Sequence, residues 1–232
     1  MLLCIDVGLR NLSLCIMTKH INEYSIHLWD NYDLMPSNIR ACEGIKKSGG
    51  ICCKVSSLKS SGKYYCKTHG KGLTEAIIVV KKKLISSYTL QEIVLIVLDK
   101  ITSLYKMDTE LFQSIDKVCI EKQPRINNKM QLVSNVIFTK LVELLPTAKV
   151  RFISASKKLK IGPKIDCVTI FKGILKGAKG YSNRKNLSVT YTKDFLTNSL
   201  IVNKDFWICH FEKMSKKNDM ADSLCFCVSE LS

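Results

Sequence analysis

The sequence predicts an α/β protein with a mixed sheet of five strands flanked by helices and a small inserted segment. Three observations lead to this fold class. Short apolar runs typical of buried strands occur at 1–8, 12–18, 24–29, 117–123 and 150–153. Amphipathic patterns with a helical period separate the later runs. Residues 36–72 fit neither pattern, because glycine, serine and lysine dominate there.

The composition indicates a globular protein with one sizeable core. The chain has 232 residues, of which 46% are hydrophobic. Its longest uninterrupted apolar run, 93–98, is far too short to span a bilayer. The start of the chain lacks the pattern of a secretory signal. Several of the eleven cysteines lie within apolar runs, as expected of buried thiols in a reducing compartment. We therefore expect an intracellular protein that is neither secreted nor bound to a membrane.

The charge points to a polyanionic partner. The formal net charge is +16, and the stretch 149–193 contains a single acid, Asp166. Its basic residues are Lys149, Arg151, Lys157, Lys158, Lys160, Lys164, Lys172, Lys176, Lys179, Arg184, Lys185 and Lys193. Such a one-signed stretch favours nucleic acid as the partner, with an acidic membrane surface as the second choice. The expected DNA contacts are Lys157, Lys158, Lys160, Lys164, Arg184 and Lys185.

The first three strands are expected to form an antiparallel meander, because only short turns separate them. The first strand, 1–8, contains Asp6 near its end. A lone carboxylate in a buried strand is costly unless a cation or hydrogen bonds compensate its charge.

The inserted segment, 36–72, has too little apolar content to hold a shape without a crosslink such as a bound metal ion. It contains four cysteines and one histidine, and Cys66 and His69 have a spacing common among zinc ligands. Cys42 and one of Cys52 or Cys53 would complete a tetrahedral zinc site, and Cys53 is the residue we choose. The alternative is a disordered loop with free thiols.

Helices and strands alternate in the remainder of the chain. We expect a helix over 73–105, in which Thr89 and Glu92 have the spacing of a capping box. The strand at 117–123 ends near Glu121, and a right-handed crossover would make it parallel to the first strand. That arrangement would set Glu121 beside Asp6. A helix from Met130, stopped by Pro146, and a strand at 150–153 follow.

The last expected helix runs from about Glu212 to the end of the chain. Asp219 and Asp222 are three residues apart and share one helical face. Two neighbouring carboxylates repel each other, and Mg²⁺ or Mn²⁺ would remove that repulsion through hard oxygen ligands.

The order of elements resembles the ribonuclease H-like fold, in which acids lie on the first strand, the fourth strand and the last helix. Within that superfamily the chain resembles the RuvC-like Holliday junction resolvases of poxvirus type, which also occur in other large DNA viruses. The resemblance rests on motifs at 5–13, 120–130, 181–188 and 216–223, and the last of them, Lys216 to Ser223, is the most specific. It spans nearly the whole chain apart from the insertion.

The resemblance implies a structure-selective endonuclease that resolves four-way DNA junctions by paired nicks. Asp6, Glu121, Asp219 and Asp222 would hold two Mg²⁺ or Mn²⁺ ions, and Lys185 would match the active-site lysine of the family. The expected partners are branched DNA and a second copy of the chain, with a helical stripe in 90–105 or 130–145 as the dimer interface. A viral protein of this kind is expected in the host cytoplasm rather than the nucleus.

The chain departs from the family at two points. Lys122 follows Glu121 where relatives often have an uncharged residue, and the Cys/His insertion is absent from the compact poxvirus members. Three different functions fit the same residues. In the first alternative, the chain is another ribonuclease H-like nuclease, such as an RNA–DNA hybrid hydrolase or an integrase-like enzyme. It would otherwise be a non-catalytic zinc-containing nucleic-acid-binding protein, or a basic protein that packages DNA.

Overall fold

The computed structural model describes residues 1–34, 40–80, 87–124, 126–159 and 177–232, without the side chains of 159 and 177–185. The chain forms two compact units. The core unit comprises Met1–Leu34 and Leu90–Ser232, and the inserted unit comprises Met35–Thr89. The insertion is therefore longer than the segment 36–72 expected from the composition.

A six-stranded mixed sheet forms the centre of the core unit. Its order is β8 (Lys149–Ile153), β7 (Lys117–Glu121), β1 (Leu2–Val7), β2 (Asn11–His20), β3 (Glu23–Asp33) and β9 (Leu200–Ile201). The strands β1, β2 and β3 form the expected antiparallel meander. β7 pairs in parallel with both β1 and β8. The five expected strands are present, and β9 adds a sixth at the edge beside β3.

The register of the parallel pair β1–β7 brings two acids together. Ile5 is paired with Ile120, so the next residue on each strand is Asp6 on β1 and Glu121 on β7. The two carboxylates thus leave the sheet at the same end of neighbouring strands. This confirms that the strand carrying Glu121 is parallel to the first strand.

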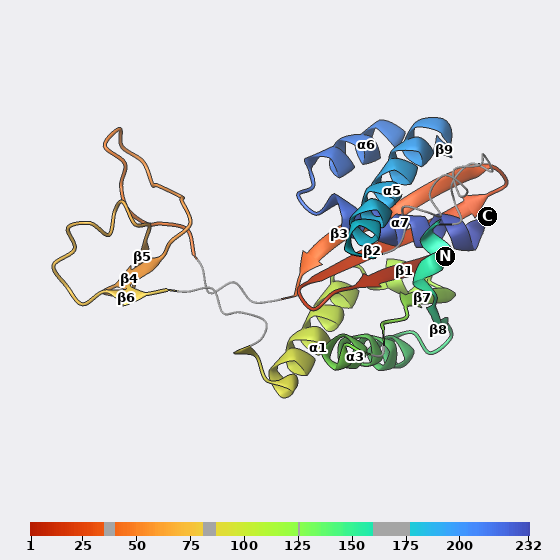
Figure 1. Ribbon diagram of the computed structural model, residues 1–232, viewed down its shortest axis with the longest axis horizontal. Coiled ribbons are helices and arrows are strands. Elements are labelled where there is room, and N and C mark those ends of the chain that lie inside the picture. The colour runs from red at the N-terminus through yellow and green to blue at the C-terminus, as the bar shows by residue number, and fades with distance from the viewer. Residues whose placement is uncertain (35–39, 81–86, 125, 160–176) are drawn as a thin grey trace. The chain divides into compact units, whose positions relative to one another are not determined.

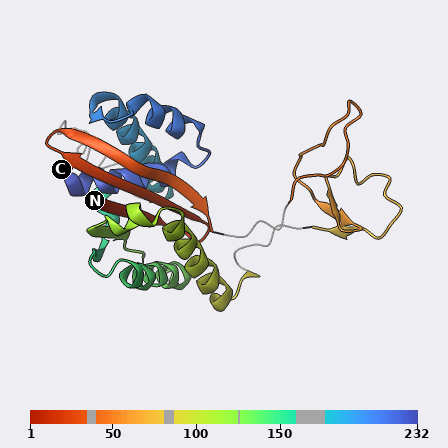
Figure 2. The ribbon, with the colours of Figure 1, turned by 180° about the vertical axis from the view of Figure 1, so that it is seen from behind.

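Helices cover both faces of the sheet (Figure 1). One face carries α1 (Leu90–Met107) and α3 (Asn128–Leu144), with the short α2 (Thr109–Gln113) between them in the chain. The other face carries α5 (Gly177–Asn198), α6 (Lys204–Lys213) and α7 (Lys217–Leu231), and a 3-10 turn, η2 (Ala155–Leu159), follows β8. The reverse view shows the same two layers on either side of the strands (Figure 2).

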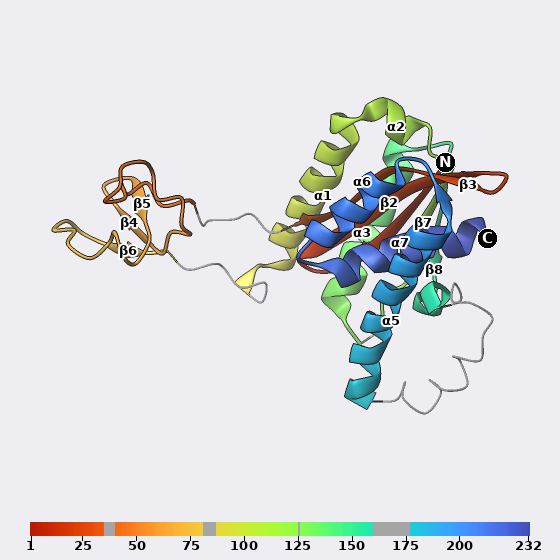
Figure 3. The ribbon, with the colours of Figure 1, turned by 90° about the horizontal axis from the view of Figure 1, so that it is seen from above.

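Helix α7 is the most deeply buried helix of the core unit. It packs on β1 and β2 and lies against α5, as the view from above shows (Figure 3). Every residue from Met220 to Val228 is buried. The Trp29 indole donates a hydrogen bond of 2.9 Å to the Met220 carbonyl and stacks on Phe211 at 5.2 Å between ring centroids. These contacts fix the start of α7, which carries Asp219 and Asp222.

Two expected helices have different bounds. The helix expected over 73–105 begins only at Leu90, directly after Thr89, and Ile78–Val79 instead form a strand, β6. The helix expected from about Glu212 is α7 and begins only at Lys217, because α6 ends at Lys213 and Met214 adopts an extended backbone. The break places Asp219 in the first turn of α7, where the positive end of the helix dipole favours a carboxylate.

The apolar stripes of α1 and α3 belong to the core rather than to an obvious dimer interface. Ile93, Val97, Ile101 and Leu104 of α1 are buried, as are Val133, Ile137 and Leu141 of α3. The two helices pack against each other within one chain. Our expectation that either stripe is free to form a dimer is therefore wrong for these residues.

The inserted unit is a small β structure. β4 (Leu58–Ser60) pairs with β5 (Lys63–Tyr65) on one side and with β6 on the other. A preceding hairpin-like loop is closed by bridges between Ala41 and Val55 and between Ile45 and Ile51. Across the described residues of both units, no helix has the length and apolar character needed to cross a membrane.

Candidate functional site

Three carboxylates converge from elements that are far apart in the sequence. Asp6 comes from β1, Glu121 from the end of β7 and Asp222 from the first turns of α7. Asp6 and Glu121 follow the paired residues Ile5 and Ile120 on neighbouring strands, and the charge of Glu121 acts on Asp6. Asp222 is close enough for its charge to act on Asp6. We call Asp6, Glu121 and Asp222 the acid cluster.

The ammonium group of Lys158 lies inside this cluster. Lys158 comes from η2, which follows β8. Its Nζ lies 2.5 Å from Asp222 Oδ2 and 3.2 Å from Glu121 Oε1. The Lys158 side chain is only 18% exposed. Burial opposes its charge, but Asp222, Glu121 and Asp6 raise the pKa of Lys158 above its ordinary value. Lys158 is therefore a fixed cation among three acids.

Asp6 and Asp222 are harder to ionise than an ordinary aspartate. Burial raises the pKa of Asp6 well above its usual range, and the neighbouring Glu121 raises it further. Burial also raises the pKa of Asp222, although Lys158 and Ser188 act in the opposite direction. The buried Asp222 and the partly buried Asp6 and Glu121, with one ammonium group, carry excess negative charge when all are ionised, and a further cation would stabilise that state.

Neighbouring groups hold the acids in place. Glu121 Oε2 accepts a hydrogen bond of 3.3 Å from Gln123 Nε2. Beside Asp222, the Ser223 hydroxyl lies 2.9 Å from the Ser13 hydroxyl, which ties α7 to β2. Asp222 Oδ1 is buried and has no hydrogen-bond partner of ordinary geometry among the described residues.

Asp219 lies one turn before Asp222 but makes a different contact. Its Oδ2 accepts a hydrogen bond of 3.1 Å from Asn11 Nδ2, at the start of β2. Asn11 also lines a cleft of about 520 Å³ whose other lining residues are Arg10, Asn31, Asp33, Met214, Ser215 and Lys216. Through Asn11, Asp219 lies beside this cleft, whose lining includes Lys216 and Arg10, the latter paired with Asp33.

The six expected DNA contacts have different positions. Lys157 forms an ion pair with Glu230 rather than presenting a free ammonium group, and Lys158 lies in the acid cluster. Arg184 and Lys185 belong to α5, but their side chains lie outside the described structure, as do Lys160 and Lys164 altogether. The role expected of Lys185 is therefore untested, and the lysine that meets the acids is Lys158.

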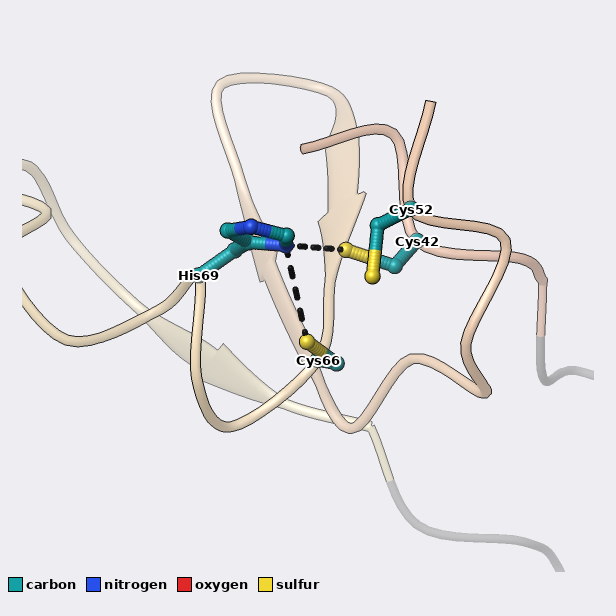
Figure 4. A group of neighbouring side chains, drawn as sticks. All are labelled: Cys42, Cys52, Cys66 and His69. Atoms are coloured by element: carbon teal, nitrogen blue, oxygen red, sulfur yellow. Dashed lines mark hydrogen bonds between the residues drawn. The ribbon is translucent and has the colours of Figure 1, made fainter. Parts of the chain in front are cut away.

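The inserted unit contains the second candidate site (Figure 4). Cys42, Cys52, Cys66 and His69 offer ligand atoms that all lie within 4.8 Å of one another. His69 Nδ1 lies 3.3 Å from Cys42 Sγ and 3.7 Å from Cys66 Sγ. Tetrahedral zinc, with bonds of about 2.0–2.3 Å, separates its ligand atoms by roughly 3.3–3.8 Å. Within the described part of the chain this is the one such group, and the carboxylates of the acid cluster are more widely spaced.

The local backbone favours the thiolate at Cys66, whereas burial raises the pKa of Cys42. Backbone N–H groups of His69 and Thr68 lower the pKa of Cys66 to about 6, against the effect of burial. Gly44 donates its N–H to Cys42 Sγ at 3.4 Å. A Cβ at Gly44 would lie 2.5 Å from the His69 ring, so only glycine allows the ring to approach.

Cys52, and not Cys53, is the fourth member of the group. Cys52 is buried in the cluster, whereas Cys53 is exposed and has a left-handed backbone with φ of 53°. Cys52 Sγ lies with the ligand atoms of Cys42, Cys66 and His69, and Cys53 is not part of this group. The choice of Cys53 from the sequence was therefore wrong.

Comparisons with known proteins give limited similarity. No family model matches the chain. A protein of Acanthamoeba polyphaga mimivirus, described as uncharacterized, is 25% identical over 231 residues, covering 88% of this chain and 53% of that protein. The chain thus spans about half the length of this curated relative. The Thermus thermophilus RuvC structure is 10% identical, with a TM-score of 0.32 over 78% of this chain and 87% of that chain. The function therefore has to be argued from the residues of this chain.

Proposed function

We propose that this chain is a metal-dependent endodeoxyribonuclease that resolves four-way DNA junctions by paired nicks. The observation that carries the proposal is the convergence of Asp6, Glu121 and Asp222 around Lys158. Gathering several carboxylates in a poorly solvated site is destabilising, so such a cluster indicates a functional role. A protein that only binds DNA gains nothing from such a cluster, and this favours catalysis over the non-catalytic alternative.

Divalent metal ions fit this set of groups. Asp6, Glu121 and Asp222 supply hard oxygen ligands, Asp222 Oδ1 lacks an ordinary partner, and Asp219 is one turn away. We infer that these four acids hold Mg²⁺ or Mn²⁺, two ions per site. When bound, such ions would lower the pKa of the attacking water and stabilise the leaving 3′ oxygen.

Lys158 is proposed to change partners in the working enzyme. In the described structure its ammonium group balances Glu121 and Asp222. A bound metal ion would balance Glu121 and Asp222 in place of Lys158. The Lys158 ammonium group would then face the scissile phosphate. Positive charge held at that position stabilises the negative charge that develops on the phosphate. Lys185 keeps the same proposed role from the family resemblance, as a second basic group near the DNA.

DNA is the proposed substrate because of the charge of the chain and its resemblance to junction resolvases. The net charge of +16 favours a polyanion. The cleft beside Asn11 is lined by Lys216 and by Arg10, which pairs with Asp33, and we propose that a strand leading to the acid cluster passes along it. Two symmetric cuts require two active sites at a fixed distance, so we propose a homodimer. The viral relative supports a viral origin, and the host cytoplasm rather than the nucleus is our proposal for the location.

We also propose that Cys42, Cys52, Cys66 and His69 hold one structural zinc ion. The distances around His69 Nδ1 support this, as does the lowered pKa of Cys66, because zinc binds the thiolate. The inserted unit has few buried apolar residues besides these cysteines, and a metal would supply part of its stability.

The substrate is tested by offering the full chain three labelled nucleic acids with Mg²⁺: a four-way DNA junction, a linear DNA duplex and an RNA–DNA hybrid. The proposal expects paired nicks in the junction, with 5′-phosphate and 3′-hydroxyl ends, and little cutting of the other two. Preferential cutting of the hybrid would favour a hybrid-specific ribonuclease H-like activity instead. Binding to the junction without any metal-dependent cutting would favour a non-catalytic DNA-binding protein.

A further inference from the structure

The inserted unit carries positive charge that it does not neutralise. Between residues 40 and 80 the acids are Glu43 and Glu75. The basic residues are Arg40, Lys46, Lys47, Lys54, Lys59, Lys63, Lys67 and Lys71. None of these eight forms an ion pair with a described residue. Such an excess of unpaired cations in about forty residues is unfavourable without a counter-charge.

In the core unit, by contrast, several basic residues form ion pairs with carboxylates of the same chain. Lys117, Arg151 and Lys157 all pair with the buried carboxylate of Glu230. Lys193 and Lys217 share Glu212. Pairing within the chain is thus common in one unit and absent from the described part of the other. The charge of the inserted unit therefore points to an external polyanion.

Two of the unpaired cations are held in position by one aromatic ring. Lys59 on β4 lies directly opposite Tyr64 on β5. The Tyr64 ring centroid is 5.3 Å from Lys59 Nζ and 5.2 Å from Arg40 Cζ. The carboxylate of Glu43 accepts a hydrogen bond from the Tyr64 backbone N–H instead of pairing with either cation. The ring thus orients two positive charges and leaves them available to a ligand.

We propose that the inserted unit is a second DNA contact of this chain, which binds the phosphate backbone of a duplex arm. Arg40 and Lys59, held on Tyr64, form its centre, and the exposed lysines of the unit extend it. Lysine and arginine contacts to phosphates position a protein without reading sequence, so the contact is independent of base sequence. The identity of the polyanion as DNA rests on the proposed function. Zinc at Cys42, Cys52, Cys66 and His69 holds the surface together.

A protein partner is the competing occupant. Ile45, Ile51 and Val55 are exposed, and so are Ile78 and Val79. Exposed apolar residues are ordinary in so small a unit, which cannot bury them all. The charge and its lack of internal partners favour DNA.

The test measures DNA binding by the full chain without added divalent ions, so that cutting does not interfere. The variant Arg40→Gln with Lys59→Gln removes both charges beside Tyr64 and keeps long side chains. The matched control, Lys106→Gln with Lys213→Gln, removes two exposed lysines from α1 and α6 of the core unit. Affinity for a labelled four-way junction and a linear duplex is measured across a range of salt concentrations, and zinc content confirms that the unit is folded.

The proposal expects the Arg40/Lys59 variant to bind both DNAs about tenfold more weakly, with a shallower dependence on salt. The log–log slope should fall by about one for each phosphate that is no longer neutralised, whereas the control should retain affinity and slope. Cys52→Ser should lose zinc together with a comparable share of affinity. An Arg40/Lys59 variant that keeps wild-type affinity and slope would overturn the inference and leave a protein as the partner of this surface.

Cutting of the junction is scored separately with Mg²⁺, and the two proposals therefore fail independently. A chain that binds DNA through Arg40 and Lys59 but never cuts it would refute the nuclease and leave this contact in place. If the wild-type chain cuts the junction normally and the Arg40/Lys59 variant binds DNA with an unchanged salt slope, only the proposed contact is refuted.

Discussion

Lys158 Nζ lies 2.5 Å from Asp222 Oδ2, which joins the turn after β8 to the start of α7. The same ammonium group reaches Glu121 on β7 at 3.2 Å. One cation thus connects two of the three carboxylates that the fold gathers at the end of the sheet. The predictions below begin with this contact.

Lys158→Met should impair both stability and cutting. Removing the cation leaves Glu121 and Asp222 buried without their partner, which costs about 3–5 kcal/mol in comparable pairs. The rate of junction cutting should fall by about 10²-fold or more, because charge stabilisation at the phosphate is lost. Unfolding curves in denaturant and single-turnover cutting with Mg²⁺ give the two quantities.

Lys157→Met is the matched control for this change. Lys157 is the neighbouring lysine, but it pairs with Glu230, which keeps Lys117 and Arg151 as partners. This variant should lose less stability and cut at nearly the wild-type rate. Equal loss of cutting in both variants would mean that Lys158 has no special role.

The two adjacent cysteines should differ in their effect on zinc. Purified wild-type protein should contain about one zinc per chain. Cys52→Ser should lose it, because Cys52 lies with Cys42, Cys66 and His69. Cys53→Ser should keep it, because Cys53 is exposed. Metal analysis of the three proteins decides this, and zinc-free wild-type protein would refute the site.

Glu230 should make the core unit sensitive to acid. Burial opposes its ionisation, yet hydrogen bonds from Lys117 and Lys157 lower the pKa of Glu230 to about 2. In the unfolded chain a glutamate has a pKa of about 4.3. The folded state therefore binds this proton more weakly, so the contribution to stability is present above about pH 4.3 and is lost as the pH falls toward 2.

Glu230→Gln isolates this effect. The variant should be less stable than the wild type at neutral pH, and the difference should shrink as the pH falls from about 4.3 toward 2. Denaturation at a series of pH values measures the free energy of unfolding for both proteins. A constant difference across this range would contradict the assigned pairing.

The fold was predictable largely because strands with β-branched residues alternate with amphipathic helices. The proximity of Asp6 and Glu121 followed from the parallel crossover between their strands. The helix expected from residue 73 was wrong because Ile78 and Val79 fit a helical period, whereas their pairing with β4 makes them a strand. The break at Met214 had no sequence signal, since neither glycine nor proline lies there.

Two site residues could not be identified from the sequence for simple geometric reasons. Lys157, Lys158 and Lys160 look alike as a run of charges, and only the direction of η2 sends Lys158 toward the acids. Its position just after the β8 strand is the one signal that would have singled it out. Cys52 and Cys53 are adjacent and chemically identical, so only the backbone decides which of them faces His69.

The proposed pair of nicks requires two active sites in one complex. Sedimentation of the full chain on a four-way junction should show two chains per junction, and the two nicks should appear nearly together. Because α1 and α3 bury their apolar stripes, the interface must use other surfaces of the core unit. A single chain on the junction with two unlinked nicks would contradict the homodimer.

Single-turnover cutting of a four-way junction by wild type and Asp222→Asn, with Mg²⁺, tests the central claim most directly. The substitution keeps the shape of the side chain and removes the charge that meets Lys158 in the acid cluster. The account predicts paired nicks by the wild type and a rate lower by about 10³-fold or more in the variant, with junction binding retained. Near wild-type cutting by Asp222→Asn would contradict the assignment of the acid cluster as the active site.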